Sequence, residues 1–321
     1  MSYLQMVSGL FPRNVLSVGV AFALSWASFG SLRADVSVIA VDVYNKKIHV
    51  EQDANEKRPI GGLAKVATAL VALDWSEVTK VSLGTLTTVE SGAAQWGGGI
   101  GLAPGDQVSL RDLIYASMMT SDDDAATTLA AFVGNDINVR RDRRGNPIET
   151  FVDEMNKLAA REGMKRTHFA NPHGSDAGRS ISTAADLARL SMYAISRAPF
   201  RFYTNQRSRS ISVIRGGVPL SVTLQNTNSL LGTGTIDGMK TGNTAQSGGC
   251  IIVTEERPGT VMKDINGQDA VFRHRMVAII LGSGDPFTEG QGLLQQGWSA
   301  YEQWLASGRP IKSPKHLLAT F

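Results

Sequence analysis

A lysine at the start of an apolar segment is the first residue of this chain whose type and position suggest chemistry. Lys65 precedes the run Val66–Leu73, whose alanines and leucines predict a helix buried on most faces. Lysine is rarely buried without a partner or a task. A lysine in this place can be the base for a serine one helical turn earlier, but that position is Gly62. The sequence therefore predicts a site arranged for serine chemistry that lacks the serine.

Two predicted helices meet at a polar elbow that contains Ser121 and Asp123. A segment that resembles a capping box opens a predicted helix over residues 109–119, and helical composition resumes over 125–133. An elbow of this kind is well placed to present side chains into a cleft. The aspartates at 122–124 can also cap the second helix, and the sequence leaves that alternative open for at least one of them.

A third segment, Asp237–Thr244, lies between predicted strands and contains the string K-T-G at 240–242. Three-residue strings recur by chance, so this string alone is a weak signal. Together with Lys65 and Ser121 it completes the order S-x-x-K, S-D-N and K-T-G, of which two motifs are imperfect. This combination predicts a groove in which two ammonium groups and a hydroxyl meet.

In this combination the chain resembles the serine-type D-Ala-D-Ala carboxypeptidases, the low-molecular-mass penicillin-binding proteins. The resemblance covers about Val36 to Ala306. It implies an α+β, β-lactamase/transpeptidase-like fold, with an antiparallel sheet flanked by helices, a helical subdomain, and a cleft that binds peptidoglycan stem peptides. Further blocks that carry it are Gly101–Asp106, Asp124–Ala126, Asn171–Gly174 and Asn226–Leu231.

The resemblance also implies roles for individual residues. In that family the first-motif serine attacks the D-Ala-D-Ala carbonyl, the lysine takes its proton, and an acyl-enzyme is hydrolysed. Backbone N–H groups at 62 and 243 would form the oxyanion hole. The implied ligand is a stem peptide ending in D-Ala-D-Ala or a β-lactam, and no metal or cofactor is implied. The implied catalytic positions are Gly62, Lys65, Ser121 and Lys240, and the substrate-binding positions are Asp123, Thr241, Gly242 and Asn243.

Three departures from the family pattern bear on activity. Gly62 retains an N–H but cannot form a covalent intermediate. Asp123 stands where the family has asparagine, and an ionised carboxylate only accepts hydrogen bonds. The segment Gly282–Glu289, where family members commonly carry an arginine, contains only acidic charges. An aspartate at 123 can instead pair with Lys65 or Lys240 and compensate a buried charge.

These departures favour a member of the carboxypeptidase family, acting in peptidoglycan metabolism, whose acyl transfer is lost or severely weakened. The alternative is a non-catalytic stem-peptide-binding or regulatory protein that uses the inherited cleft. Ser121 is the hydroxyl we expect near the two lysines, but its family role in proton transfer argues against its use as a substitute nucleophile. A β-lactamase relative is less favoured because the motif spacing and the Asn171–Gly174 block are typical of the carboxypeptidases.

Bulk properties exclude several other classes. The fractions of hydrophobic residues (42%) and charged residues (19%) are those of a globular protein and exclude disorder. The net charge of +3 gives no support for nucleic-acid binding. A single cysteine, Cys250, excludes an intramolecular disulfide, and the five histidines have no zinc-site spacing.

Residues 1–34 have the layout of a secretory signal peptide. Arg13 precedes the apolar run Val15–Trp26, and small residues lead to Ala34. The alternative is an uncleaved anchor, but the run is shorter than the roughly 20 residues of a membrane span, so no stable anchor is expected. We expect residues 35–321 to form one periplasmic or extracytoplasmic domain without the family's C-terminal β-domain.

The remaining pattern predicts elements around these motifs. The helix that begins near Lys65 is expected to end near Asp74, and residues 135–150 are expected to form a basic surface loop. His173 is predicted to be structural, and the Gly-rich segment 97–101 a plain loop. All predicted strands are assigned to one antiparallel sheet. They are Val36–Val43, Ile48–Glu51, Ile211–Ile214, Val222–Gln225, Gly248–Thr254 and Met276–Leu281, and the other predicted helices are Phe151–Arg161, one beginning at Ser182 and Glu289–Ala306.

Overall fold

The computed structural model describes residues 36–96, 99–177, 179–263, 268–309, 311 and 313–318. The predicted signal peptide lies outside these residues. Among the helices that the structure describes, none combines the length and apolar character that a membrane span needs.

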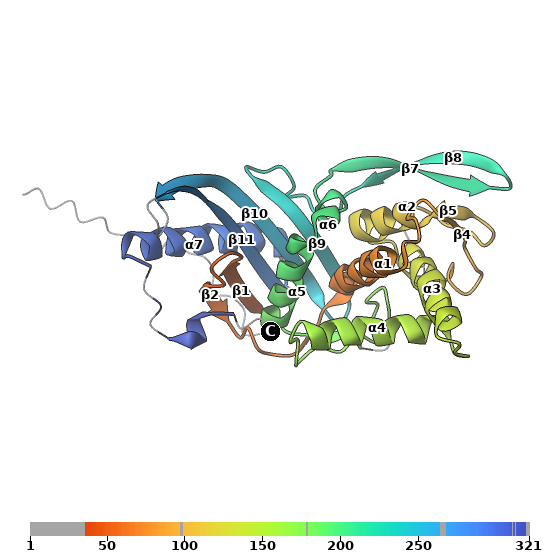
Figure 1. Ribbon diagram of the computed structural model, residues 1–321, viewed down its shortest axis with the longest axis horizontal. Helices are drawn as coiled ribbons and strands as arrows, with labels where there is room; N and C mark the ends of the chain where they lie inside the picture. Colours follow the sequence, from red (N-terminus) through yellow and green to blue (C-terminus); the bar gives the residue numbers. More distant parts are fainter. Residues whose placement is uncertain are drawn as a thin grey trace, which may run out of the picture. The chain divides into compact units, whose positions relative to one another are not determined.

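A five-stranded antiparallel sheet with the strand order β2-β1-β11-β10-β9 forms the core (Figure 1). Every residue of β1 is buried, as expected for a strand with apolar layers on both faces. β9 pairs with β10 and is an edge strand of this sheet. The five strands are β1 (Ser37–Asp42), β2 (Ile48–Gln52), β9 (Ile236–Thr244), β10 (Gly248–Lys263) and β11 (Asp269–Ser283).

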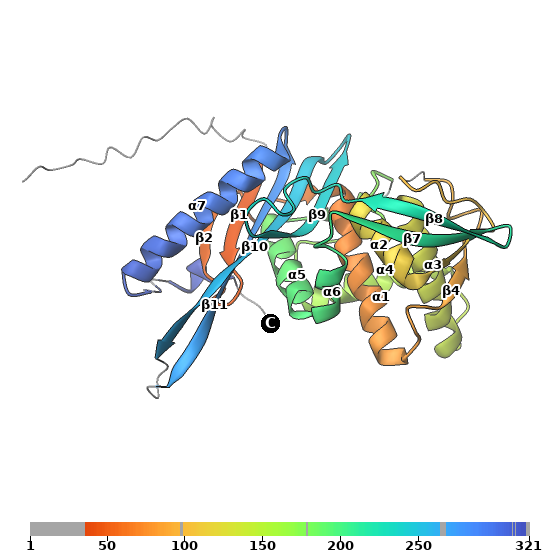
Figure 2. The ribbon, with the colours of Figure 1, turned by 90° about the horizontal axis from the view of Figure 1, so that it is seen from above.

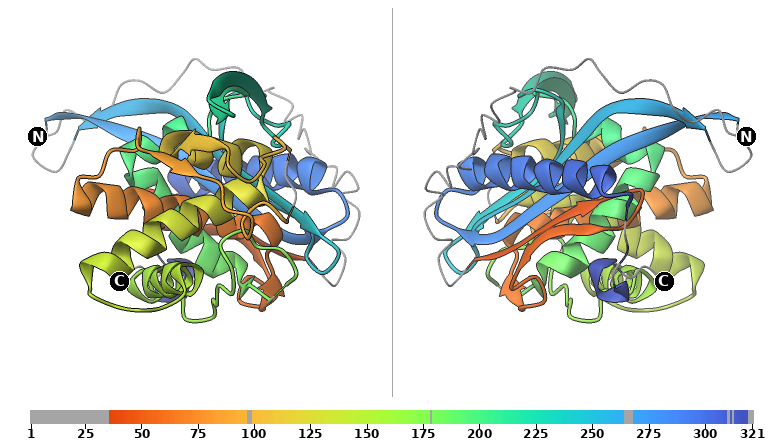
Figure 3. Two further views of the ribbon diagram at one scale, coloured as in Figure 1. Left: turned by 90° about the vertical axis from the view of Figure 1, so that its right-hand side faces the viewer. Right: turned by 90° about the vertical axis from the view of Figure 1, so that its left-hand side faces the viewer.

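Helices cover both faces of this sheet (Figure 2). α7 (Pro286–Ala306) contacts β1, β2, β10 and β11 on one face, and α5 (Ala184–Ser196) contacts β1 and β11 on the other. Figure 3 shows α7 lying across the sheet. A side chain at Gly297 would approach Ala40 Cβ to 3.0 Å, so the glycine lets the helix pack closely on β1. α7 begins earlier than the predicted Glu289 because Asp285 caps it.

The helical region is built around α1 (Lys65–Thr79), which a 3₁₀ turn at Gly61–Ala64 precedes. Residues 65–73 are all buried, which confirms the predicted buried helix. The predicted end near Asp74 was wrong, because α1 continues to Thr79. Asp74 lies within the helix and accepts a hydrogen bond from Tyr193 Oη at 2.6 Å. The other helical elements are α2 (Leu110–Tyr115), a π-helical turn (Ala116–Thr120), α3 (Asp123–Arg140), α4 (Pro147–Arg161) and α6 (Ala198–Phe202).

The predicted loop at 135–150 was wrong at both ends. α3 continues to Arg140, and α4 begins at Pro147 behind the cap residue Asn146. A Cβ at Gly134 would lie 1.9 Å from the Pro147 carbonyl oxygen, so the two helices cross where one has no side chain. This close contact stabilises the end of α3 and the start of α4, where the local composition predicts a loop.

The assignment of all strands to one sheet was also wrong. The strands predicted at 211–214 and 222–225 belong to a separate four-stranded sheet with the order β4-β5-β7-β8. Most of β8 is exposed, so its pattern cannot satisfy a central position in the core sheet. The strands of this sheet are β4 (Leu86–Thr88), β5 (Gln107–Ser109), β7 (Ser208–Arg215) and β8 (Val218–Gln225), and β3 (Arg58–Pro59) pairs separately with β6 (Ile181–Ser182).

Candidate functional site

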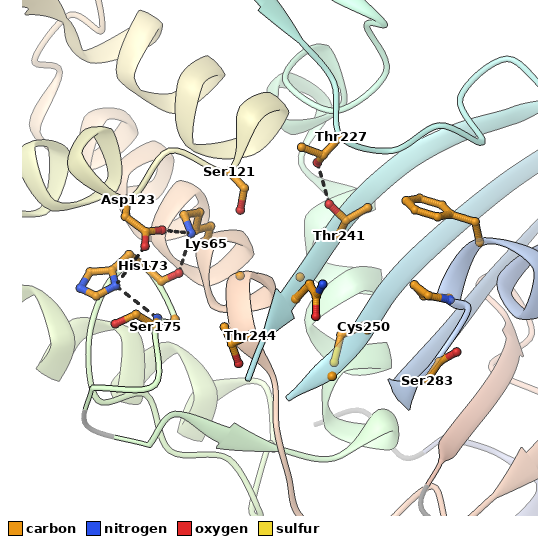
Figure 4. Close-up of a pocket in the computed structure, with 18 of the residues that line it drawn as sticks. Lys65, Ser121, Asp123, His173, Ser175, Thr227, Thr241, Thr244, Cys250 and Ser283 are labelled. Atoms are coloured by element: carbon orange, nitrogen blue, oxygen red, sulfur yellow. Dashed lines mark hydrogen bonds and ion pairs between the residues drawn. The ribbon is translucent and has the colours of Figure 1, made fainter. Parts of the chain in front are cut away.

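A cleft of about 770 Å³ lies where the helical region meets the edge strand of the core sheet (Figure 4). Its walls come from the 3₁₀ turn and the start of α1, the elbow before α3, the loop at 173–175, the ends of β9 and β10, and the start of α7. Seven of the eight residues predicted for the site line it, namely Gly62, Lys65, Ser121, Asp123, Thr241, Gly242 and Asn243.

Lys65 is fully engaged by protein groups. Its Nζ lies 2.5 Å from Asp123 Oδ1 and donates to the His173 carbonyl at 2.6 Å. The lysine is 1% exposed, and this burial lowers its pKa while the Asp123 charge opposes the shift. Of the two partners that the sequence allowed for Asp123, the structure therefore selects Lys65.

Gly62 leaves a gap that Ser121 borders. An ideal Cβ at Gly62 would lie 2.8 Å from Ser121 Oγ and 3.3 Å from the Thr241 carbonyl oxygen. Gly62 is not among the residues with positive φ, whereas Gly61 has a φ of 51°. The backbone at 62 therefore does not require glycine, and the missing side chain is a chemical difference.

The three aspartates of the elbow have three different tasks. Asp122 caps α3 by accepting from Ala125 N at 2.7 Å, which confirms the capping alternative for this residue. Asp124 accepts from Trp96 N at 2.9 Å and so holds the segment that contains Trp96 against the elbow. Asp123 is left to face the cleft beside Ser121, whose φ of 60° sets the turn between the helices.

β9 brings the K-T-G segment against the 3₁₀ turn. A Cβ at Gly242 would lie 2.8 Å from Gly62 N, so glycine at 242 permits the close approach of the two backbones. Thr241 Oγ1 lies 2.6 Å from Thr227 Oγ1 at the cleft wall. Thr227 belongs to the block Asn226–Leu231, which carries the family resemblance, but no contact was predicted for this residue.

Lys240 differs from the expectation that its ammonium group reaches the groove. It is 1% exposed, does not line the cleft, and donates from Nζ to the Thr241 carbonyl at 2.6 Å. Burial lowers its pKa well below the usual value, and the nearby charge of Lys65 acts in the same direction. Side chains alternate along a strand, so Lys240 and the half-buried Thr241 point to opposite faces of β9.

His173 lines the cleft as a neutral ring. Its Nδ1 accepts from Ser175 N at 3.2 Å, and its ring centroid lies 4.7 Å from that of Trp96. Burial lowers its pKa to about 4, so the imidazole is uncharged at neutral pH. Trp96 could not be selected from the sequence, because a single tryptophan beside a Gly-rich segment has no distinctive spacing.

The opposite end of the cleft is formed by residues 283–287 at the start of α7. Asp285 caps the helix by accepting from Thr288 N at 3.2 Å. Of the described residues that line the cleft, none is an arginine. Within the described ranges, no group of three His, Cys, Asp or Glu side chains is arranged to hold a metal ion.

The family model for D-alanyl-D-alanine carboxypeptidases, peptidase family S11, matches residues 27–263. This chain belongs to that family. The carboxypeptidase DacC of Escherichia coli strain K12 is 28% identical over 278 residues, which are 82% of this chain and 61% of DacC. DacF of Bacillus subtilis strain 168 is 23% identical over 78% of this chain and 58% of its own length. The chain thus spans about three fifths of these relatives.

Solved structures confirm the predicted α+β, β-lactamase/transpeptidase-like fold. The Streptomyces K15 DD-transpeptidase has a TM-score of 0.70 and 22% identity, and the match covers 83% of this chain and 97% of that protein. The carboxypeptidase DacD from Francisella tularensis has a TM-score of 0.68 and 22% identity, over 84% of this chain and 71% of that protein.

Proposed function

We propose that this member of the carboxypeptidase family binds peptidoglycan stem peptides in its cleft, and that its acyl transfer is lost or severely weakened. The observation that carries the proposal is the joint state of positions 62 and 65. Gly62 has no nucleophilic atom, and the Lys65 ammonium is bonded to Asp123 at 2.5 Å.

Both parts of the family's first chemical step are affected. A covalent intermediate needs an attacking oxygen at position 62, and a base needs a free lone pair on Lys65 Nζ. The ion pair with Asp123 and the bond to the His173 carbonyl engage the Nζ atom that would have to take the proton. Loss of the nucleophile alone reduces turnover on the order of a million-fold in the best-studied serine protease.

Ser121 is the nearest hydroxyl to the gap, but among the described contacts no hydrogen bond joins it to either lysine. Lys65 Nζ is bonded to Asp123 and to the His173 carbonyl, while Lys240 Nζ is bonded to the Thr241 carbonyl. A serine hydroxyl without an adjacent base is a weak nucleophile. These contacts support loss of acyl transfer rather than the use of Ser121 as a substitute nucleophile.

Binding, by contrast, needs groups that the cleft still presents. β9 is an edge strand, and an extended peptide can pair with such an edge through main-chain hydrogen bonds. Thr227 and Thr241 add hydroxyl groups at the wall. The ligands that fit this proposal are a stem peptide ending in D-Ala-D-Ala or a β-lactam.

We further propose that the protein acts in the periplasm or another extracytoplasmic space. The layout of residues 1–34 as a signal peptide supports this location, with residues 35–321 as the mature domain. Family membership is in keeping with it, because the substrate of a D-Ala-D-Ala carboxypeptidase is part of the cell wall.

The test is to measure D-Ala release from a stem pentapeptide beside equilibrium binding of the same peptide. The proposal predicts that the wild type binds the peptide saturably and releases no more D-Ala than the Lys65→Ala variant does. Release that Lys65→Ala abolishes would show a working enzyme. Absence of both binding and release would remove the cleft as a peptide site.

A further inference from the structure

The N-terminus of α7 is directed to one end of the cleft, and it is already occupied by an anion of the protein. Asp285, Pro286 and Phe287 line the cleft, and α7 runs for 21 residues behind them. Such a terminus attracts negative charge through its free N–H groups and its dipole. Here Asp285 accepts from Thr288 N, and proline at 286 has no N–H to offer.

Asp285 carries its charge at neutral pH. Hydrogen bonds from Thr288 hold the pKa of this carboxyl below its usual value. The side chain is exposed, and Asp285 is one of the residues that line this end of the cleft. A second carboxylate placed there would meet like charge and would find the helix terminus already capped.

The cations near the cleft do not offset this charge. Of the described residues that line the cleft, Lys65 is the one lysine, and it is paired with Asp123. Lys240 is not one of the lining residues, and its Nζ donates to the Thr241 carbonyl oxygen. His173 is uncharged at neutral pH because burial lowers its pKa to about 4. One lysine and two aspartates therefore give the lining a formal charge of −1.

We propose that the cleft selects stem peptides whose carboxyl end is uncharged, as an amide or as a chain that continues into a cross-link, and that Asp285 sets this preference against a free C-terminal carboxylate. The inference rests on the proposed peptide-binding function and specifies its ligand class. Peptides of this class are products of reactions that amidate or cross-link stem peptides. A cleft without acyl transfer would then hold such products and leave them intact.

The test compares two probes that differ in one charge. Diacetyl-L-Lys-D-Ala-D-Ala and its C-terminal amide are titrated by calorimetry into the full chain at pH 7 and low ionic strength. Asp285→Asn removes the charge and keeps a residue that caps helices equally well. Asp153→Asn, at an exposed position on α4 that does not line the cleft, is the matched control.

We expect the wild type to bind the amide more tightly than the acid by roughly fivefold, a difference that shrinks as salt is added. Asp285→Asn should bring the two affinities to within roughly twofold, and Asp153→Asn should retain the wild-type ratio. Equal or tighter binding of the acid by the wild type overturns this inference and leaves the binding function standing. If neither probe binds, the proposed function and this inference both fail.

Discussion

Replacing Asp123 with asparagine tests whether the Lys65 ion pair is a built part of the fold. The side chain of Lys65 is 2% exposed and that of Asp123 is 25% exposed, with 2.5 Å between Nζ and Oδ1. Asparagine preserves the shape of the side chain but removes its charge. The Lys65 ammonium would then keep the His173 carbonyl as a partner and lose its compensating anion.

The magnitude follows from the burial of the two groups. Removing one partner of a fully buried ion pair costs about 3–5 kcal/mol. Because a quarter of Asp123 is open to water, we expect Asp123→Asn to lower the free energy of unfolding at pH 7 by about 2–3 kcal/mol. In the double variant with Lys65→Met, much of this loss should disappear, since no unpaired charge remains.

Urea unfolding followed by circular dichroism measures these differences. Lys157→Met is the matched control, because Lys157 is 58% exposed in its pair with Glu154, and its loss should change stability by less than about 0.5 kcal/mol. A comparable, small effect of Asp123→Asn would refute the reasoning that Asp123 neutralises a buried ammonium.

Two further predictions follow from the glycines and from His173. Gly62→Ser should change the free energy of unfolding by less than about 1 kcal/mol, because φ at 62 is ordinary and the atom closest to the new Cβ is a hydroxyl at the end of a side chain, Ser121 Oγ. Gly61→Ala meets a similar hydroxyl, Ser247 Oγ, but should lower the free energy of unfolding by about 1–3 kcal/mol because φ at 61 is 51°. Equal effects in denaturant unfolding would contradict this. The folded pKa of His173, about 4, lies below its unfolded value near 6.5, so the unfolded state binds the proton first and stability falls as pH decreases from about 6.5 to about 4. His173→Gln should remove about 3 kcal/mol of that pH dependence and leave the contribution of His49, whose pKa is also about 4. An unchanged pH profile would show that His173 is not held neutral by burial.

The parts of the fold that depend on local pattern were predictable from the sequence. The apolar run after Lys65 has one reading, a buried helix, and α1 is buried through residue 73. The first two strands and the start of β10 were predicted in the same way, because alternation and turn residues are local signals. The choice of strand partners was not predictable, since β7 and β8 pair with β4 and β5 through contacts distant in sequence.

The site was predictable to the level of its motifs and no further. Motif order placed Lys65, Ser121 and Thr241 around one cleft, and the structure brings them there. Whether a motif residue lines the cleft depends on strand geometry. The alternation of side chains along β9 places Thr241 in the lining and leaves Lys240 out of it. The position of Asp285 depends on where α7 begins, and the predicted start was three residues too late.

The most direct test of the central claim is intact-mass analysis of the full-length protein after incubation with labelled penicillin. The account predicts no covalent adduct, because position 62 has no oxygen to acylate and Lys65 Nζ is engaged by Asp123. A stoichiometric adduct on the wild type that is absent from Lys65→Ala would contradict it.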